Sequence, residues 1–245
     1  MNQINHRKNH KLVLMSLGGS VGKTLIAVHG LYPLLPDATI LCVDQVNTTA
    51  ADFGIENCEQ HAGDEFNKMY RSLMSMDGNV IVDVGGSKEC KEFLEGMLAV
   101  DGSDQITKFI IPSRPNSKDQ GCAIDTIERL LMDGVDRSKI KVVFTDVKKN
   151  VADEFKQLID GMAENRLYPD LNLMIQHSPL FGEMIELKLL ITDIIADTTD
   201  YAAKAANRSS DDHIDYVGMH LRQRMAIKTA WPNLQYVFSK LLEEA

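Results

Sequence analysis

An apolar run followed by a glycine-rich loop constrains the fold of this chain more than any other feature. The run covers residues 12–15, and the loop after it ends in Gly22-Lys23-Thr24. An amphipathic segment over residues 25–35 follows, so the order is strand, loop and helix, as in a phosphate-binding loop (P-loop). Glycines let several backbone N–H groups point at one phosphate chain, and a helix N-terminus adds partial positive charge there.

The residue types of the loop predict a role for each member. Lys23 would reach the β- and γ-phosphates, and the Thr24 hydroxyl would bind Mg²⁺. The general pattern places a further glycine five residues before Gly22, where this chain has Leu17. The alternative interpretation is therefore a glycine-rich turn before an ordinary surface helix. The backbone cradle would consist of Gly18, Gly19, Ser20, Val21 and Gly22.

Strand-like apolar runs alternate with helix-like stretches along most of the chain. The expected strands are residues 12–16, 39–43, 79–84, 106–111, 140–145 and 171–175. The expected helices among them are residues 23–34, 64–76, 88–99, 117–133 and 151–164. This alternation predicts an α/β fold, with a mainly parallel twisted sheet flanked by helices and ligands at the carboxyl ends of the strands.

The last quarter of the chain reads as helical throughout. The expected helices are residues 184–196, 199–207, 212–229 and 232–244, with a break at residues 209–212 and a helix start at Trp231-Pro232. We expect residues 184–245 to form a helical C-terminal layer on the same domain. Residues 1–245 would then make up a single P-loop NTPase domain with a flexible tail at residues 1–10.

Composition narrows the classes of function. The net charge of −9 indicates that the chain as a whole does not bind polyanions. The four cysteines lack metal or redox spacing, which favours a reducing cytosol. No apolar stretch reaches the roughly 18 residues of a membrane-spanning helix, and the polar start lacks the apolar core of a signal peptide. These observations predict a cytoplasmic protein without a transmembrane segment.

Two aspartates close strand-like runs where a Mg²⁺–nucleotide site would need them. Asp44 follows the run at residues 39–43, and Asp83 lies in the run at residues 79–84. A carboxylate at the carboxyl end of a strand can hold metal-bound water beside the phosphates. We expect both to serve the metal and Asp44 to take part in catalysis, while Gly85 supplies a backbone N–H to the γ-phosphate. The alternative for each aspartate is a helix or turn cap.

With these motifs the chain resembles the ParA/MinD group of deviant-Walker ATPases, most closely its plasmid-stability branch (StbB-type). The resemblance covers roughly residues 11–180 and is carried by residues 18–24, by Val43-Asp44, and by Val82-Asp83-Val84-Gly85-Gly86. It implies a cytosolic bacterial ATPase that dimerises around ATP and Mg²⁺. Such proteins work with a DNA-binding or other protein adaptor to position DNA, or with membrane partners to place the division machinery.

Two departures from the family pattern predict slow hydrolysis. Most ParA-like loops read Lys-Gly-Gly-x-Gly-Lys-Thr, and their first lysine crosses the dimer interface, whereas Gly18 stands at that position here. Arg114 could supply a cation instead, or it is an ordinary solvated loop arginine. The family also has Asp-x-Asp after the second strand, whereas Val46 replaces the second carboxylate here. Asn47 or Asp52 could compensate for it in part.

Two further groups of residues leave alternatives open. Asp146, at the end of the run at residues 140–145, is either a contact to the nucleotide base or a helix cap. Arg222, Arg224 and Lys228 form either a solvated helix face or a weak DNA contact.

Together these features predict a nucleotide-dependent switch ATPase of the ParA/MinD kind, acting with a protein partner in plasmid stability, partition or DNA positioning. The alternatives are a metabolic P-loop enzyme, such as a dethiobiotin-synthetase-like ligase or a small-molecule kinase, and a non-hydrolysing nucleotide-binding adaptor. The sequence leaves ATP and GTP open, with ATP expected.

Overall fold

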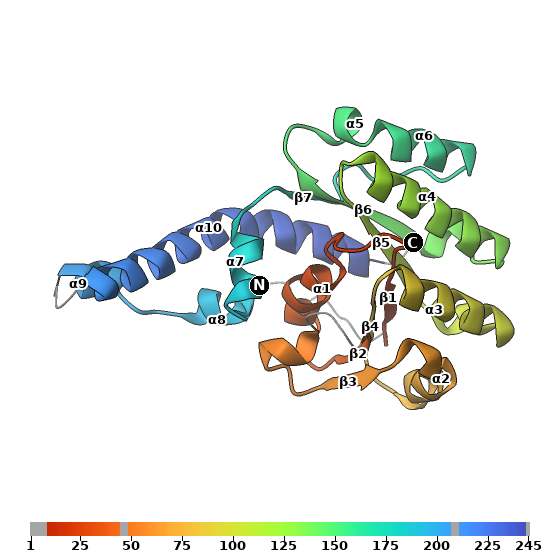
Figure 1. Ribbon diagram of the computed structural model, residues 1–245, viewed down its shortest axis with the longest axis horizontal. Coiled ribbons are helices and arrows are strands. Elements are labelled where there is room, and N and C mark those ends of the chain that lie inside the picture. Colours follow the sequence, from red (N-terminus) through yellow and green to blue (C-terminus); the bar gives the residue numbers. More distant parts are fainter. Residues whose placement is uncertain (1–8, 45–48, 207–210, 244–245) are drawn as a thin grey trace.

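A seven-stranded parallel sheet forms the centre of the molecule (Figure 1). The computed structural model describes residues 9–44, 49–206 and 211–243. Every neighbouring strand pair in the order β3-β2-β4-β1-β5-β6-β7 is parallel, which confirms the predicted fold class. The strands are β1 (Lys11–Leu14), β2 (Thr39–Val43), β3 (Cys58–His61), β4 (Val80–Val84), β5 (Lys108–Ser113), β6 (Ile140–Val147) and β7 (Met174–Gln176).

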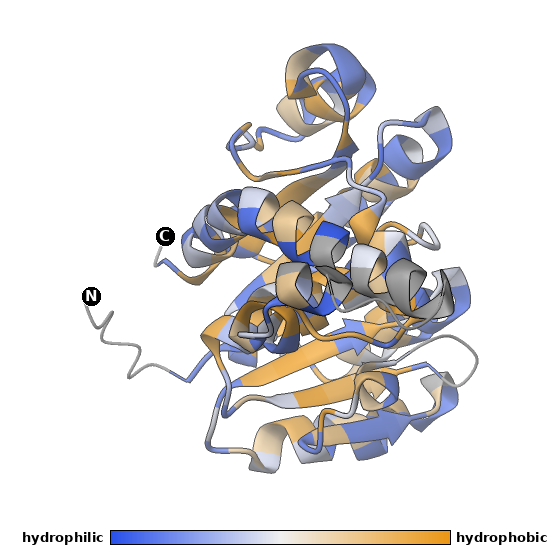
Figure 2. Cartoon of the chain, turned by 90° about the vertical axis from the view of Figure 1, so that its left-hand side faces the viewer, coloured by the Kyte–Doolittle hydropathy of each residue, from blue (hydrophilic) through white to orange (hydrophobic). Residues whose placement is uncertain are grey.

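Successive side chains of each strand point to opposite sides of the sheet, so the strands present apolar side chains on both faces. Helices cover both of these faces. In β1, Val13 belongs to one apolar cluster, and Leu12 and Leu14 belong to the other. The strands are therefore apolar almost throughout, as the orange strands in Figure 2 show. The first face carries α2 (Phe66–Ser75), α3 (Ser87–Ala99), α4 (Ser117–Met132), α5 (Val151–Glu154) and α6 (Lys156–Glu164).

The second face carries the helical segment that follows the glycine-rich loop. This segment begins as α1 (Lys23–Leu25), continues as a π-helix (Ile26–Leu31) and ends in a 3₁₀ turn (Tyr32–Leu34). The predicted helix at residues 23–34 is thus confirmed in extent, although half of it has the wider π geometry. A Cβ atom on Gly30 would lie 2.3 Å from the Phe238 ring. Glycine at this position lets the last helix pack directly against the segment behind the loop.

The last helix, α10 (Asp211–Leu242), is continuous. The predicted helix start at Trp231-Pro232 is wrong, because Pro232 lies inside α10. A proline removes one intrahelical hydrogen bond, but the turns after it are held by buried side chains and by the Lys108 ammonium, which donates to the Leu241 carbonyl at 2.7 Å. The buried side chains are Leu234, Val237, Phe238 and Leu241.

The other C-terminal helices also differ in detail from the prediction. The expected helix at residues 184–196 is divided into α7 (Leu180–Glu186) and α8 (Ile191–Ala196), and Lys188 between them has a φ of 53°. Helix α9 is Tyr201–Ala206. The predicted break at residues 209–212 lies partly outside the described residues. Figure 1 shows α9 and the first half of α10 extending beyond the sheet.

Strand β3 was not predicted from the sequence. Its residues Cys-Glu-Gln-His are polar, and they pair only on one side, with β2, because β3 lies at the edge of the sheet. Most of the expected tail, residues 1–8, lies outside the described residues, and His10 is buried. Within the described part of the chain, no helix has both the length and the apolar character needed to cross a bilayer.

Candidate nucleotide-binding site

The glycine-rich loop connects β1 to α1 at the carboxyl end of the sheet. Ser20 and Gly22 have φ values of 57° and 96°, the left-handed conformation that reverses the chain. The Leu17 N–H donates to the Thr126 hydroxyl at 3.0 Å. On the other side, the Thr145 hydroxyl lies 3.0 Å from the Val21 carbonyl oxygen, to which it can donate. The loop is therefore fixed from α4 and from β6.

Lys23 is buried inside this loop. Its side-chain ammonium donates to the Gly18 carbonyl at 3.2 Å, and the residue is 7% exposed. Burial lowers the pKa of Lys23, while the charges of Asp83 and Asp44 act in the opposite direction. The ammonium is thus held over the backbone cradle by an interaction that a phosphate oxygen can replace.

Thr24 and Asp83 form a direct contact beside Lys23. The Thr24 hydroxyl donates to Asp83 Oδ2 at 2.7 Å. Asp83 Oδ1 is buried and has no hydrogen-bond partner among the described residues. Burial raises the pKa of Asp83 to about 6, despite the hydrogen bond from Thr24 and the charge of Lys23. A hydroxyl and a carboxylate that keeps one oxygen unsatisfied are the hard ligands that Mg²⁺ prefers, so these two residues fit the ion and its waters.

Asp44 lies against Gly85, where β2 and β4 end side by side. The Gly85 N–H donates to the Val43 carbonyl at 2.9 Å. A Cβ atom on residue 85 would lie 2.6 Å from Asp44 Oδ2, so only glycine allows this approach. Asp44 is 8% exposed. The two strand ends therefore bring a second carboxylate to the same side of the loop.

One cavity of about 750 Å³ joins these groups. Gly18 is the predicted site residue that does not line it, because it packs beneath the loop, where a Cβ atom would lie 3.4 Å from that of Cys122. The wall continues along residues 175–179 and into α7. The predicted residues that line the cavity are Gly19, Ser20, Val21, Gly22, Lys23, Thr24, Asp44, Asp83, Gly85 and Asp146.

Asp146 lines this cavity and has two partners. Its Oδ1 is 2.5 Å from His177 Nδ1, and Oδ2 accepts a 3.5 Å hydrogen bond from Arg114. The helix-cap interpretation of Asp146 is wrong, because Asn150 caps α5. Arg114 lies in the cavity wall as the ion-pair partner of Asp146, with its side chain 43% exposed. Sequence reasoning missed His177, although its place two residues after the expected last strand was the available signal.

Other candidate residues lie away from the cavity. Asp52 accepts from the Thr49 N–H at 2.9 Å and pairs with Lys188 at 3.1 Å, outside the cavity lining. Val46 and Asn47 lie outside the described residues.

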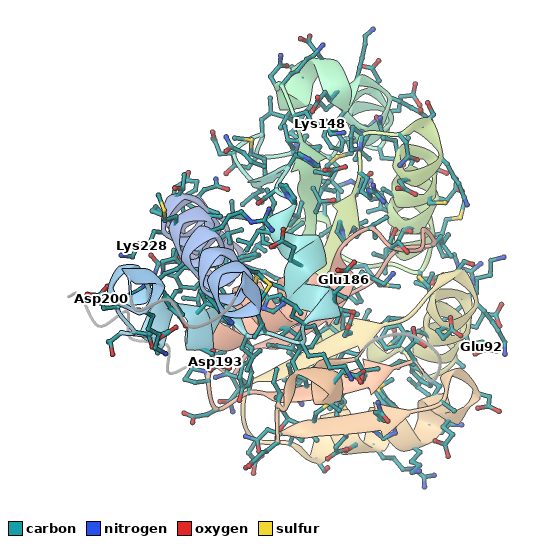
Figure 3. The ribbon with its side chains drawn as sticks, turned by 60° about the vertical axis from the view of Figure 1, so that its left-hand side comes forward. Glu92, Lys148, Glu186, Asp193, Asp200 and Lys228 are labelled. Carbon is teal, nitrogen blue, oxygen red and sulfur yellow. The ribbon has the colours of Figure 1, made fainter. Side chains whose placement is uncertain are left out.

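Two of the three basic residues of α10, Arg222 and Lys228, are exposed, as expected of a solvated helix face, and Arg224 is half-buried. Arg222 forms an ion pair with Glu183 of α7, and Arg224 donates to the Thr199 carbonyl at 2.6 Å. Figure 3 shows Lys228 on α10 and Glu186 on the adjacent α7. These bonds hold two of the three basic side chains against the chain itself.

Comparison with known proteins identifies the fold. No protein-family model matches the chain, and a search of curated proteins finds no match. Among solved structures, apo McdA from Cyanothece has a TM-score of 0.56 and 15% identity, covering 87% of this chain and 100% of that chain. The Aquifex aeolicus cell division protein MinD has a TM-score of 0.55 and 14% identity, covering 82% and 98%.

A third similar structure is a candidate plasmid partition protein from Borrelia burgdorferi, solved with AMPPNP. It has a TM-score of 0.51 and 11% identity, covering 91% of this chain and 99% of that chain. At such low identity these likenesses show the fold alone. The chain therefore has the P-loop NTPase fold of MinD- and McdA-type proteins.

Proposed function

We propose that this protein is a nucleotide-dependent switch ATPase of the ParA/MinD kind, which binds ATP with Mg²⁺ at the cavity. The observation that carries the proposal is the Thr24–Asp83 hydrogen bond beside the buried Lys23 ammonium. A P-loop lysine and hydroxyl with a strand-end carboxylate are the groups that nucleoside triphosphate and Mg²⁺ require. Two similar structures that contain nucleotide support the proposal: McdA with ATP, and the Borrelia burgdorferi protein with AMPPNP.

Each side chain has a role in this proposal. The backbone of residues 19–22 cradles the phosphates, and Lys23 neutralises charge on the β- and γ-phosphoryl oxygens. Thr24 and Asp83 would hold the metal and its water, while Asp44 would hold metal-bound water and take part in catalysis. Gly85 offers its N–H to the γ-phosphate when its bond to Val43 opens, and Asp146 contacts the base. Mg²⁺, when bound, supplies further neutralisation of phosphate charge.

The proposed setting is the bacterial cytoplasm, with residues 1–245 as one domain. The switch acts in plasmid stability, partition or DNA positioning through a protein adaptor, and its own contact with DNA is weak or indirect. A nucleotide-dependent homodimer would form without the usual trans lysine. The MinC:MinD complex among the similar structures supports a protein partner.

Calorimetric titration of ATP and GTP, with and without Mg²⁺, tests the site directly. Lys23→Ala removes charge-assisted hydrogen bonds worth about 1.5–3 kcal/mol each, so affinity for the triphosphate should fall at least tenfold. Lys118→Ala, at an exposed lysine on α4, is the matched control and should bind as the unmodified protein does. Unchanged affinity in Lys23→Ala would contradict the proposal.

A metabolic kinase or ligase is the second candidate. It is favoured by the Asp146–His177 pair, a polar group in the lining of the same cavity that does not belong to the P-loop sequence and could serve an acceptor substrate. Pull-down from a bacterial extract with and without ATP separates the two candidates. A switch exchanges protein partners with nucleotide, whereas a metabolic enzyme captures the same proteins in both conditions.

A further inference from the structure

Two cysteine thiols face each other at the edge of the nucleotide cavity. Cys42 in β2 and Cys58 in β3 have their sulfur atoms 3.4 Å apart. Cys42 is 1% exposed and lines the cavity, whereas Cys58 is half-buried on the edge strand. Both are free thiols. Fifteen residues separate them in the sequence, so the pair exists only through the register of β2 with β3.

We propose that Cys42 and Cys58 form a redox couple, which hydroperoxides oxidise to a disulfide that weakens nucleotide binding. The effect on nucleotide binding rests on the function proposed above, whereas the formation of the disulfide does not.

The two thiols differ in a way that assigns their roles. Cys42 is 1% exposed, whereas Cys58 is half-buried on the edge strand, and a hydrogen bond from Cys42 lowers the pKa of Cys58. The more exposed Cys58 is therefore the sulfur that a peroxide reaches first, and its thiolate is the nucleophilic form. Cys42 is the buried sulfur that closes the pair.

The chemistry balances with one molecule of hydrogen peroxide. The Cys58 thiolate attacks one peroxide oxygen, the O–O bond breaks, and a sulfenic acid and, after proton uptake, one water form. The Cys42 sulfur then attacks the sulfenic sulfur, its proton leaves with the hydroxyl group as a second water, and the S–S bond closes. The two sulfurs lose two electrons, and the peroxide gains them.

Closing this bond acts on the site through Cys42. A disulfide requires an S–S distance of about 2.05 Å, so the two sulfurs must approach by more than 1 Å. Cys42 is the register partner of Asp83 across β2 and β4, and Asp44 follows two residues later. The backbone of Ala50 and Ala51, in the turn after β2, also interacts with the two thiols. A shift of Cys42 therefore reaches both carboxylates of the proposed metal site.

Hydrogen peroxide treatment of the full chain, followed by thiol blocking and peptide mass spectrometry, tests the couple. We expect a Cys42–Cys58 linked peptide that dithiothreitol removes. Absence of this peptide, or a Cys90–Cys122 linked peptide in its place, would overturn the proposal. The detection of this peptide needs no nucleotide. If the reduced protein binds no nucleotide, that result would refute the proposed function and leave the redox couple standing.

The second measurement is the affinity for ATP and Mg²⁺ before and after peroxide. In the unmodified protein and in Cys122→Ser we expect at least a tenfold loss that dithiothreitol reverses. Cys58→Ser, which does not alter the cavity lining, should keep the affinity of the reduced protein throughout. Equal loss in Cys58→Ser, or no loss in the oxidised unmodified protein, would refute the effect on the site.

Discussion

Two buried side chains, His29 and Asp83, predict opposite effects of pH on the stability of the ligand-free protein. Burial lowers the pKa of His29 from 6.5 to about 4, and it raises that of Asp83 from 3.8 to about 6. Unfolded His29 binds a proton near pH 6.5, whereas the folded chain accepts it only near pH 4. The free energy of unfolding therefore decreases as the pH falls from about 6.5 to 4. Folded Asp83 binds a proton near pH 6 that the unfolded chain accepts only near pH 3.8, so stability rises as pH falls.

The magnitudes nearly cancel in the unmodified protein. One pKa unit corresponds to about 1.4 kcal/mol of free energy. Between pH 7.5 and 5, His29 alone costs about 2 kcal/mol and Asp83 alone contributes about 1.4 kcal/mol, so the pair together loses about 0.6 kcal/mol. His29→Leu should reverse the trend to a gain of about 1.4 kcal/mol, and Asp83→Asn should reveal the full loss of about 2 kcal/mol.

Urea unfolding at pH steps from 7.5 to 5, followed by the fluorescence of Trp231, measures these slopes. Other titrating groups are common to the three proteins and cancel in the differences. Neither ring nitrogen of His29 has a hydrogen-bond partner among the described residues, so leucine there should not destabilise the protein at pH 7.5. If His29→Leu keeps the pH dependence of the unmodified protein, the burial argument is refuted.

Four further outcomes are expected. Asp83→Asn should weaken nucleotide binding more with Mg²⁺ than with EDTA, by calorimetry; equal losses would indicate a structural role. Lys108→Met removes two ammonium bonds to the end of α10, to the Leu241 and Glu243 carbonyls, and should lower the free energy of unfolding by about 3 kcal/mol. Gly30→Ala should cost about 1–3 kcal/mol by its clash with Phe238, and Phe238→Leu should recover part of this in the double variant. Turnover of ATP by the purified protein should lie well below about 10 s⁻¹; fast turnover without a partner would show that another group orients water.

The sequence could predict those parts of the fold whose structure follows from the pattern of apolar and turn residues within one segment. Both faces of the central strands are covered, so β1 is apolar after Lys11 and β4 is apolar apart from Asp83. The glycine-rich loop, Asp44 and Asp83 follow from strand order alone, since the carboxyl ends of parallel strands meet at one edge of the sheet. Strand order was therefore enough to predict that these residues would lie together, and they line one cavity.

The remaining features depend on contacts between distant segments. Strand β3 is polar because it is an edge strand, and its existence is decided by pairing with β2. The continuity of α10 through Pro232 requires the burial of the turns after it and the Lys108 ammonium from β5, 133 residues away from Leu241. The Asp146–Arg114 and Cys42–Cys58 contacts likewise join separate segments of the chain. Cysteine spacing predicted no redox pair because spacing along the chain does not contain the register of β2 with β3, which brings the two thiols together, or that of β2 with β4, which places Cys42 opposite Asp83.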